Sequence, residues 1–130
     1  MREFVGNVAV VTGAGSGLGR ALALECGRRG MRVVAADIAA EQAEETAGLL
    51  DGDSVGIECD VADAESVDEL AEFTLRRFGR VDLLINNAGI LTTGEVPEST
   101  LSTWRRTLDV NLMGVVHGVL AFVPRMRERG

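Results

Sequence analysis

The sequence predicts an α/β fold in which a parallel sheet is covered by helices on both faces. Short apolar runs alternate four times with longer helical patterns, and the connections between them are brief. A glycine-rich loop joins the first apolar run to the first helical pattern, which is typical of phosphate-binding α/β domains. The length of 130 residues suits one domain, residues 1–130. We therefore expect a doubly wound parallel sheet.

The first half of the chain is expected to contain three strands and two helices. The strands are predicted from short apolar runs at residues 8–12, 32–37 and 54–59. The first helix is predicted at residues 18–29, which are rich in alanine and leucine and precede Gly30, a natural C-cap. The second helix is predicted from apolar residues at helical spacing, namely Ala40, Ala43, Ala47 and Leu50.

The second half is expected to contain one further strand and three helices. Asp63 can cap a helix that ends at Gly79. One face of that helix carries Val67, Leu70, Ala71, Thr74, Leu75 and Phe78. A strand at residues 81–86 follows, and then a short helix capped by Ser99 or Thr100. The last helix carries one apolar face, made of Leu108, Leu112, Val115, Val116, Val119, Phe122, Val123 and Met126. His117 points away from this face and is expected, without a partner, at the surface or a boundary.

Composition and charge restrict the class of partner and the location. The net charge of −7 argues against binding to nucleic acid or to an anionic membrane. The longest apolar stretch, residues 110–124, is too short to span a bilayer, and no signal-peptide layout is present. We therefore expect a cytoplasmic protein. Cys26 and Cys59 form no metal-binding or redox motif and are expected to be reduced thiols in the core.

The loop at residues 11–19, VTGAGSGLG, has the arrangement that a dinucleotide-binding fold needs. Gly13 permits a tight turn, and Gly17 lacks the Cβ atom that would keep a pyrophosphate away. Gly19 allows the following helix to pack closely on the sheet. The first turn of that helix then offers unpaired N–H groups and a positive dipole end to the phosphates.

Asp37 ends the second predicted strand and lies 18 residues after Gly19, the last glycine of the loop. A carboxylate at this position can accept hydrogen bonds from both hydroxyls of the adenosine ribose, and it repels a 2′-phosphate. No arginine adjoins it, so NAD is favoured over NADP. The alternative is that Asp37 only caps the next helix.

Four motifs together resemble the N-terminal half of the short-chain dehydrogenase/reductase family. They are TGAGSGLG at residues 12–19, the pair Asp60 and Val61, NNAG at residues 86–89, and Asn111 within DVNLMG. Their order and spacing match the family over nearly the whole chain. The resemblance implies a Rossmann-type sheet and hydride transfer between a nicotinamide and an alcohol or carbonyl substrate, with no metal ion.

The resemblance also implies roles for individual residues. Asp60 would bond the adenine amino group, Asn87 and Gly89 would border the nicotinamide ribose, and Asn111 would hold a water that relays protons to the catalytic lysine. The full cofactor-binding set would be Thr12, Gly13, Ser16, Gly17, Leu18, Gly19, Asp37, Ile38, Asp60, Val61, Asn87, Ala88 and Gly89. Alternatively, Asn86 and Asn87 only tie strand ends together, and Asn111 only kinks its helix.

The catalytic serine and Tyr-x-x-x-Lys of the family have no match among these residues. The chain contains no tyrosine, all 13 basic residues are arginine, and it ends at Gly130, where the strand with the serine is expected to begin. The expected strand order 3-2-1-4-5-6 is then cut after strand 4, which leaves an open sheet edge. That edge, or the long helix, which forms a dimer interface in the family, is expected to support a homo-oligomer.

Two functions therefore stay open at this point. In the first, the chain is the N-terminal part of an NAD-dependent oxidoreductase whose catalytic residues lie elsewhere. In the second, it is a dinucleotide-binding or protein-interaction module without catalysis, as the lack of tyrosine and lysine suggests. The raw sheet edge favours the first, because natural proteins usually cover such edges.

Overall fold

The computed structural model describes residues 3–91 and 100–129, and this part of the chain contains a four-stranded parallel sheet. The strands are β1 (Val8–Thr12), β2 (Arg32–Asp37), β3 (Val55–Glu58) and β4 (Leu83–Ile85). Their order in the sheet is β3-β2-β1-β4, and all three pairings are parallel. This order is the first part of the Rossmann order, so the predicted fold class is confirmed. The third and fourth strands are shorter than the runs that predicted them.

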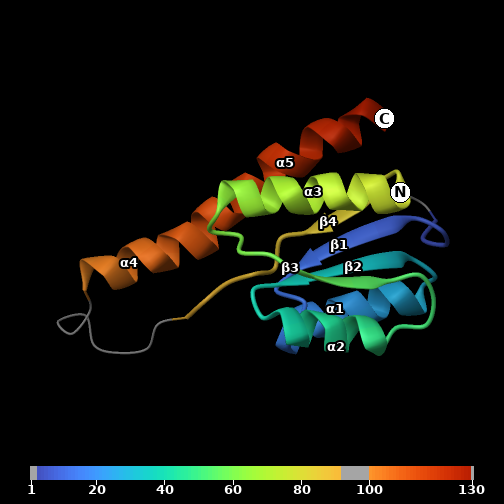
Figure 1. Ribbon diagram of the computed structural model, residues 1–130, viewed down its shortest axis with the longest axis horizontal. Helices are drawn as coiled ribbons and strands as arrows, with labels where there is room; N and C mark the ends of the chain where they lie inside the picture. Colours follow the sequence, from blue (N-terminus) through green and yellow to red (C-terminus); the bar gives the residue numbers. More distant parts are fainter. Residues whose placement is uncertain (1–2, 92–99, 130) are drawn as a thin grey trace.

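Helices cover both faces of the sheet (Figure 1). One face carries α1 (Gly17–Arg28) and α2 (Ala40–Gly48), and the other carries α3 (Ala64–Phe78) and a long helix. The long helix consists of α4 (Leu101–Leu108), a π-helical turn η2 (Asp109–Met113) and α5 (Gly114–Arg129). Within it, α5 packs beside α3, whereas α4 extends past the end of the sheet (Figure 1).

The central strand β1 is fully buried because its side chains alternate between two cores. Val8 and Val10 pack on the side of α3 and α5, together with Leu70 and Phe122. Val11 packs on the side of α1. This two-sided burial explains why the strand reads as a continuous apolar run.

Three of the predicted helix boundaries are present: the two ends of α3 and the start of α4. The Asp63 carboxylate accepts a hydrogen bond from the backbone N–H of Glu65 at 3.0 Å, and Gly79 ends α3 with a left-handed φ of 77°. At α4 the cap is Thr100, whose Oγ1 accepts from the N–H of Thr103 at 3.2 Å. The alternative cap, Ser99, lies outside the described residues.

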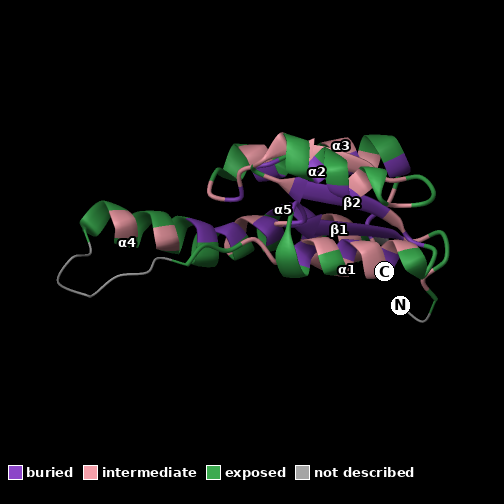
Figure 2. Cartoon of the chain, turned by 90° about the horizontal axis from the view of Figure 1, so that it is seen from below, coloured by how far each residue is buried: buried purple, intermediate pink, exposed green. Residues whose placement is uncertain are grey.

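The apolar face predicted for the long helix is divided between the core and solvent, so that prediction is wrong in part. Phe122 is fully buried, whereas Leu112 and Val119 are 56% and 44% exposed. Exposed and half-buried residues dominate α4 (Figure 2). The described helix Leu101–Glu128 has 28 residues, so by length and composition alone it could cross a membrane. The apolar stretch at residues 110–124 lies within this longer helix, and core helices of soluble proteins satisfy the same criterion.

Candidate functional site

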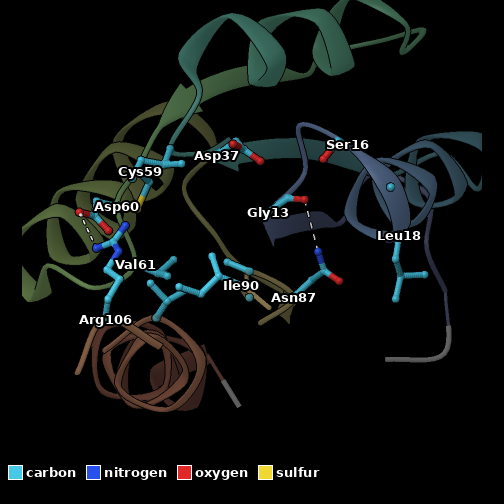
Figure 3. Close-up of a pocket in the computed structure, with 15 residues that line it drawn as sticks. Gly13, Ser16, Leu18, Asp37, Cys59, Asp60, Val61, Asn87, Ile90 and Arg106 are labelled. Carbon is cyan, nitrogen blue, oxygen red and sulfur yellow. Dashed lines mark hydrogen bonds and ion pairs between the residues drawn. The ribbon is translucent and has the colours of Figure 1, made fainter. Parts of the chain in front are cut away.

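A cavity of about 430 Å³ opens at the carboxyl ends of the strands. It lies beside the point where the strand order reverses, between β1 and β4. Such a position is the usual ligand site in open α/β sheets. Figure 3 shows side chains from α1, from the loops after β2, β3 and β4, and from the long helix around it. The lining residues are Gly13, Ser16, Gly17, Leu18, Asp37, Ile38, Cys59, Asp60, Val61, Asn87, Ala88, Gly89, Ile90, Arg106 and Val110.

Eleven of the residues expected to bind a cofactor therefore share one cavity: Gly13, Ser16, Gly17, Leu18, Asp37, Ile38, Asp60, Val61, Asn87, Ala88 and Gly89. Thr12, Gly19 and Asn111 are not among its lining residues. Sequence reasoning did not select Cys59, Ile90, Arg106 and Val110. Arg106 precedes Val110 by one helical turn, so the two share a helix face, but no sequence motif marks that face as part of a site.

Three of the four glycines in the loop, Gly13, Gly17 and Gly19, are each required for a different structural reason. Gly13 and Gly17 adopt positive φ angles of 65° and 53°, which other residues rarely adopt. A Cβ atom on Gly17 would meet nothing within 4 Å, so open space adjoins this residue at the cavity. A Cβ atom on Gly19 would collide with the carbonyl oxygen of Gly13 and with Nδ2 of Asn87. Gly19 therefore packs closely against the glycine loop and Asn87, whereas the sequence predicted close packing of the helix on the sheet.

The N-terminus of α1 points unpaired N–H groups toward this space. The helix begins at Gly17, its N-cap Ser16 makes no side-chain capping bond, and its first turn contains no acidic residue. The first-turn N–H groups have no acceptor within the helix, and the helix dipole is positive there. Leu18, which lines the cavity, is 68% exposed. These features suit an anion with apolar groups attached.

Asp37 faces the glycine loop across the cavity edge (Figure 3). Its Oδ2 accepts from the N–H of Gly15 at 2.8 Å, and its Oδ1 accepts from the N–H of Ala39 at 2.9 Å. The N-cap of α2 is Ala39, so Asp37 is not the helix-capping residue that the alternative interpretation required. A carboxylate accepts about four hydrogen bonds, so Asp37 keeps capacity for two hydroxyl donors.

Asp60 and Val61 form the far end of the cavity with Arg106. Oδ1 of Asp60 accepts from the N–H of Ala62 at 3.0 Å, and its Oδ2 lies 4.0 Å from Nη1 of Arg106. Among the described lining residues Arg106 is the only arginine, and it lies beside Asp60 (Figure 3). No arginine side chain that lines the cavity therefore offsets the charge of Asp37.

His117 has a partner that its sequence context did not reveal. Its Nδ1 lies 2.7 Å from the carbonyl oxygen of Val61. A carbonyl oxygen only accepts, so Nδ1 carries the proton and donates it. Gly114, one turn earlier, packs against Val61 so closely that a Cβ atom would collide. His117 was expected from the sequence to have no partner, and that part of the expectation is wrong.

Thr12 and Asn87 connect the ends of β1 and β4. Oγ1 of Thr12 accepts from the N–H groups of Asn87 and Ala88, both at 3.1 Å. Nδ2 of Asn87 donates to the carbonyl oxygens of Thr12 and Gly13. Asn87 therefore ties the strand ends, as the alternative interpretation held, and it also lines the cavity. Thr12 is 4% exposed and does not line the cavity, so it contributes by fixing the backbone of Asn87 and Ala88.

Asn111 binds the segment that follows β4. Its Oδ1 accepts from the N–H of Ile90 at 2.7 Å, and its Nδ2 donates to the carbonyl oxygen of Ile90 at 2.8 Å. The residue sits in the π-helical turn, a feature often found at functional sites. These two bonds use one acceptor position of Oδ1 and one N–H of Nδ2, so the side chain keeps one acceptor position and one donor for the expected water. The proton-relay role stays a prediction.

Cys59 lines the cavity but is a poor nucleophile. Desolvation by burial raises the pKa of its thiol above the ordinary value, and the hydrogen bond to Ser66 offsets this only in part. The neutral thiol therefore dominates at physiological pH. Cys59 therefore gives this cavity no activated thiolate.

Comparison with known proteins matches this description. A family model for short chain dehydrogenases matches residues 7–130. D-threitol dehydrogenase of Mycolicibacterium smegmatis is 43% identical over 128 residues, which cover 96% of this chain and 49% of that protein. An uncharacterized short-chain type dehydrogenase/reductase of Sinorhizobium fredii is 38% identical over 131 residues, which cover 96% of this chain and 52% of that protein.

A solved structure of a short chain dehydrogenase/reductase is similar to this chain in three dimensions as well. A short chain dehydrogenase/reductase from Burkholderia phymatum, crystallised in complex with NAD, superposes with a TM-score of 0.95 at 42% identity. The match covers 99% of this chain and 47% of that one. The chain thus spans about half the length of the relatives that it matches.

Proposed function

This chain belongs to the short-chain dehydrogenase family of oxidoreductases, and from that premise we propose that it forms the NAD-binding part of a dehydrogenase. The observation that carries the proposal is the placement of Asp37 beside the glycine loop, with two of its acceptor positions unused by the residues that the structure describes. The NAD complex of the Burkholderia phymatum relative supports the same choice of cofactor.

The residues of the cavity fit the parts of a dinucleotide in order along its length. The N–H groups from Ser16 to Leu18 would hold the pyrophosphate, and Asp37 would accept the hydroxyls of the adenosine ribose. Ile38 and Val61 would enclose the adenine ring, and Asp60 would accept its amino group. The open space at Gly17 and the exposed side chains of Leu18 and Ile38 support this fit.

The nicotinamide end would lie near the end of β4, bordered by the cavity-lining residues Asn87, Ala88 and Gly89. When bound, NAD supplies a two-electron hydride acceptor. The residues of this chain would bind and orient it, with Thr12 and Asn111 fixing the backbone segments that carry the contacts. These 130 residues include no tyrosine and no lysine, so the proposal assigns transfer of the hydroxyl proton to residues outside them.

The proposed substrate class is a small alcohol or the matching carbonyl compound. The relative from Mycolicibacterium smegmatis is named for D-threitol, so polyols are the first compounds to test. We also propose a cytoplasmic location and a homo-oligomer that buries exposed apolar residues of the long helix. Those residues include Leu108, Leu112, Val115 and Val119, which are 49%, 56%, 37% and 44% exposed.

The second candidate is a dinucleotide-binding module without catalysis, favoured by the absence of tyrosine and lysine. The experiment that separates the two mixes the protein with NAD and a panel of polyols and follows the absorbance of NADH. Continuous NADH formation supports the dehydrogenase. If NADH binds but no alcohol is oxidised by the 130-residue chain or by a longer protein that contains it, the module is correct.

A matched pair of variants ties that activity to the cavity. Asp37→Asn should lower the turnover at subsaturating NAD, because the ribose loses an ionised acceptor. Asp53→Asn removes a more exposed carboxylate, which pairs with Arg77 and does not line the cavity, and it should leave the activity unchanged. Equal rates for both variants would contradict the assignment of Asp37.

A further inference from the structure

Two carbonyl groups of the glycine loop, those of Ala14 and Gly15, accept hydrogen bonds from two side chains that do not line the cavity. Oγ1 of Thr46, on α2, donates to the carbonyl oxygen of Ala14 at 2.7 Å. Nη2 of Arg20, on α1, donates to the carbonyl oxygen of Gly15 at 2.7 Å. Neither Thr46 nor Arg20 is among the residues that line the cavity.

Arg20 and Thr46 are also joined to each other. Nε of Arg20 donates to Oγ1 of Thr46 at 2.9 Å, so this hydroxyl is both acceptor and donor. Thr46 is fully buried, and the side chain of Arg20 is 26% exposed. Nη1 of Arg20 reaches outward to Glu45 at 3.0 Å. Of these contacts, only the pair with Glu45 faces solvent.

The N–H groups of the same two loop residues are engaged as well. The N–H of Ala14 donates to the carbonyl oxygen of Ala36 at 3.0 Å, and that of Gly15 donates to Oδ2 of Asp37 at 2.8 Å. Donors and acceptors of both residues are thus used, which fixes the path of the loop. The next three residues, Ser16, Gly17 and Leu18, line the cavity. The fixed Gly15 also holds the carboxylate of Asp37.

We propose that Arg20 and Thr46 are positioning residues that hold the glycine loop in its phosphate-binding form and link it to Asp37. This inference rests on the proposed binding of NAD. It assigns no contact with the ligand to either residue. It predicts that loss of the Thr46 hydroxyl weakens binding of a dinucleotide more than binding of a nucleoside without phosphates.

Two substitutions at Thr46 separate the hydroxyl from the shape of the side chain. Thr46→Val keeps the volume but leaves the carbonyl oxygen of Ala14 without the donor at Thr46 and Nε of Arg20 without its acceptor. Thr46→Ser keeps the hydroxyl and loses a methyl group, which costs stability in a buried position. We expect Thr46→Val to raise the Kd for NADH about tenfold and Thr46→Ser to change it less than about threefold.

Adenosine serves as the second ligand, because it occupies the ribose and adenine positions without a pyrophosphate. Its Kd, measured by NMR titration, should change less than that of NADH in Thr46→Val. Arg20→Met should behave like Thr46→Val. Glu45→Gln, which removes only the outer ion pair, and Arg28→Met, which removes another arginine of α1, should bind NADH like the unmodified protein.

The outcomes are separable. If the unmodified protein binds neither NADH nor adenosine, the proposed function fails and this inference fails with it. If it binds NADH and Thr46→Val binds equally well, the positioning role alone is overturned. It is also overturned if Thr46→Ser weakens binding as much as Thr46→Val, or if adenosine is affected as strongly as NADH, since either result indicates general destabilisation.

Discussion

The side-chain amide of Asn111 forms two hydrogen bonds with the backbone of Ile90, through Oδ1 at 2.7 Å and through Nδ2 at 2.8 Å. They join the π-helical turn of the long helix to the segment that follows β4. Gly89 and Ile90, in that segment, line the cavity. The shape of one end of the site therefore depends on a residue that does not line it.

Asn111→Leu should loosen this end of the site. Both hydrogen bonds are lost, so we expect the free energy of unfolding to fall by about 1–3 kcal/mol. The amide of Ile90 should lose protection in hydrogen exchange. Asn111→Asp keeps the acceptor for the Ile90 N–H but loses the donor, so its loss should be smaller. Unchanged exchange at Ile90 in Asn111→Leu would contradict this account.

A methyl group at position 19 should be poorly tolerated. In Gly19→Ala the added Cβ meets the carbonyl oxygen of Gly13 and Nδ2 of Asn87, both held by their own hydrogen bonds. We expect a loss of about 2–3 kcal/mol in stability, measured by urea unfolding.

The matched control for that substitution is Gly48→Ala. Gly48 ends α2, and a Cβ atom there meets nothing within 4 Å. This change should stabilise the protein by about 0.5 kcal/mol, because alanine favours the helix. The account of the loop is wrong if the two variants have the same stability.

The stability of the protein should fall at alkaline pH in part because of Cys59. Burial raises the pKa of its thiol above 9.0 in the folded state. Above pH 9 the unfolded chain releases this proton while the folded chain retains it, so rising pH favours unfolding. Cys59→Ala should show a shallower decline of unfolding free energy above pH 9. Parallel curves for the two proteins would show that the thiol makes no contribution.

The exposed residues of the long helix should control self-association. Val119→Asp places a charge on a residue that is 44% exposed, and we expect it to lower the mass measured by light scattering. Leu49→Asp, at the C-cap of α2, where the leucine is 57% exposed, should leave the mass unchanged. A single-chain mass for the unmodified protein at every concentration would rule out the proposed homo-oligomer.

Local patterns in the sequence were sufficient for the sheet and for most of the cavity. The order of the strands follows from the alternating pattern, and the caps at Asp63 and Gly79 follow from residue chemistry. Asp37 lies beside the glycine loop because β1 and β2 are parallel neighbours, which place their carboxyl ends at one edge.

Contacts between distant segments were beyond the reach of those patterns. His117 binds the carbonyl of Val61, and Arg106 approaches Asp60, only because the long helix packs against the segment that follows β3. The apolar residues of that helix face two directions, and periodicity could not separate the side that meets the core from the exposed side. The sequence also could not predict that Asn111 binds the backbone of Ile90, because every residue carries the same backbone groups.

The most direct test of the central claim compares NADH with NADPH by calorimetric titration of the unmodified protein and of Asp37→Asn. The account predicts that NADH binds at least about tenfold more tightly than NADPH, because the Asp37 carboxylate accepts the ribose hydroxyls and repels a 2′-phosphate. Asp37→Asn should reduce that preference. Tighter binding of NADPH by the unmodified protein, or no binding of either dinucleotide, would contradict it.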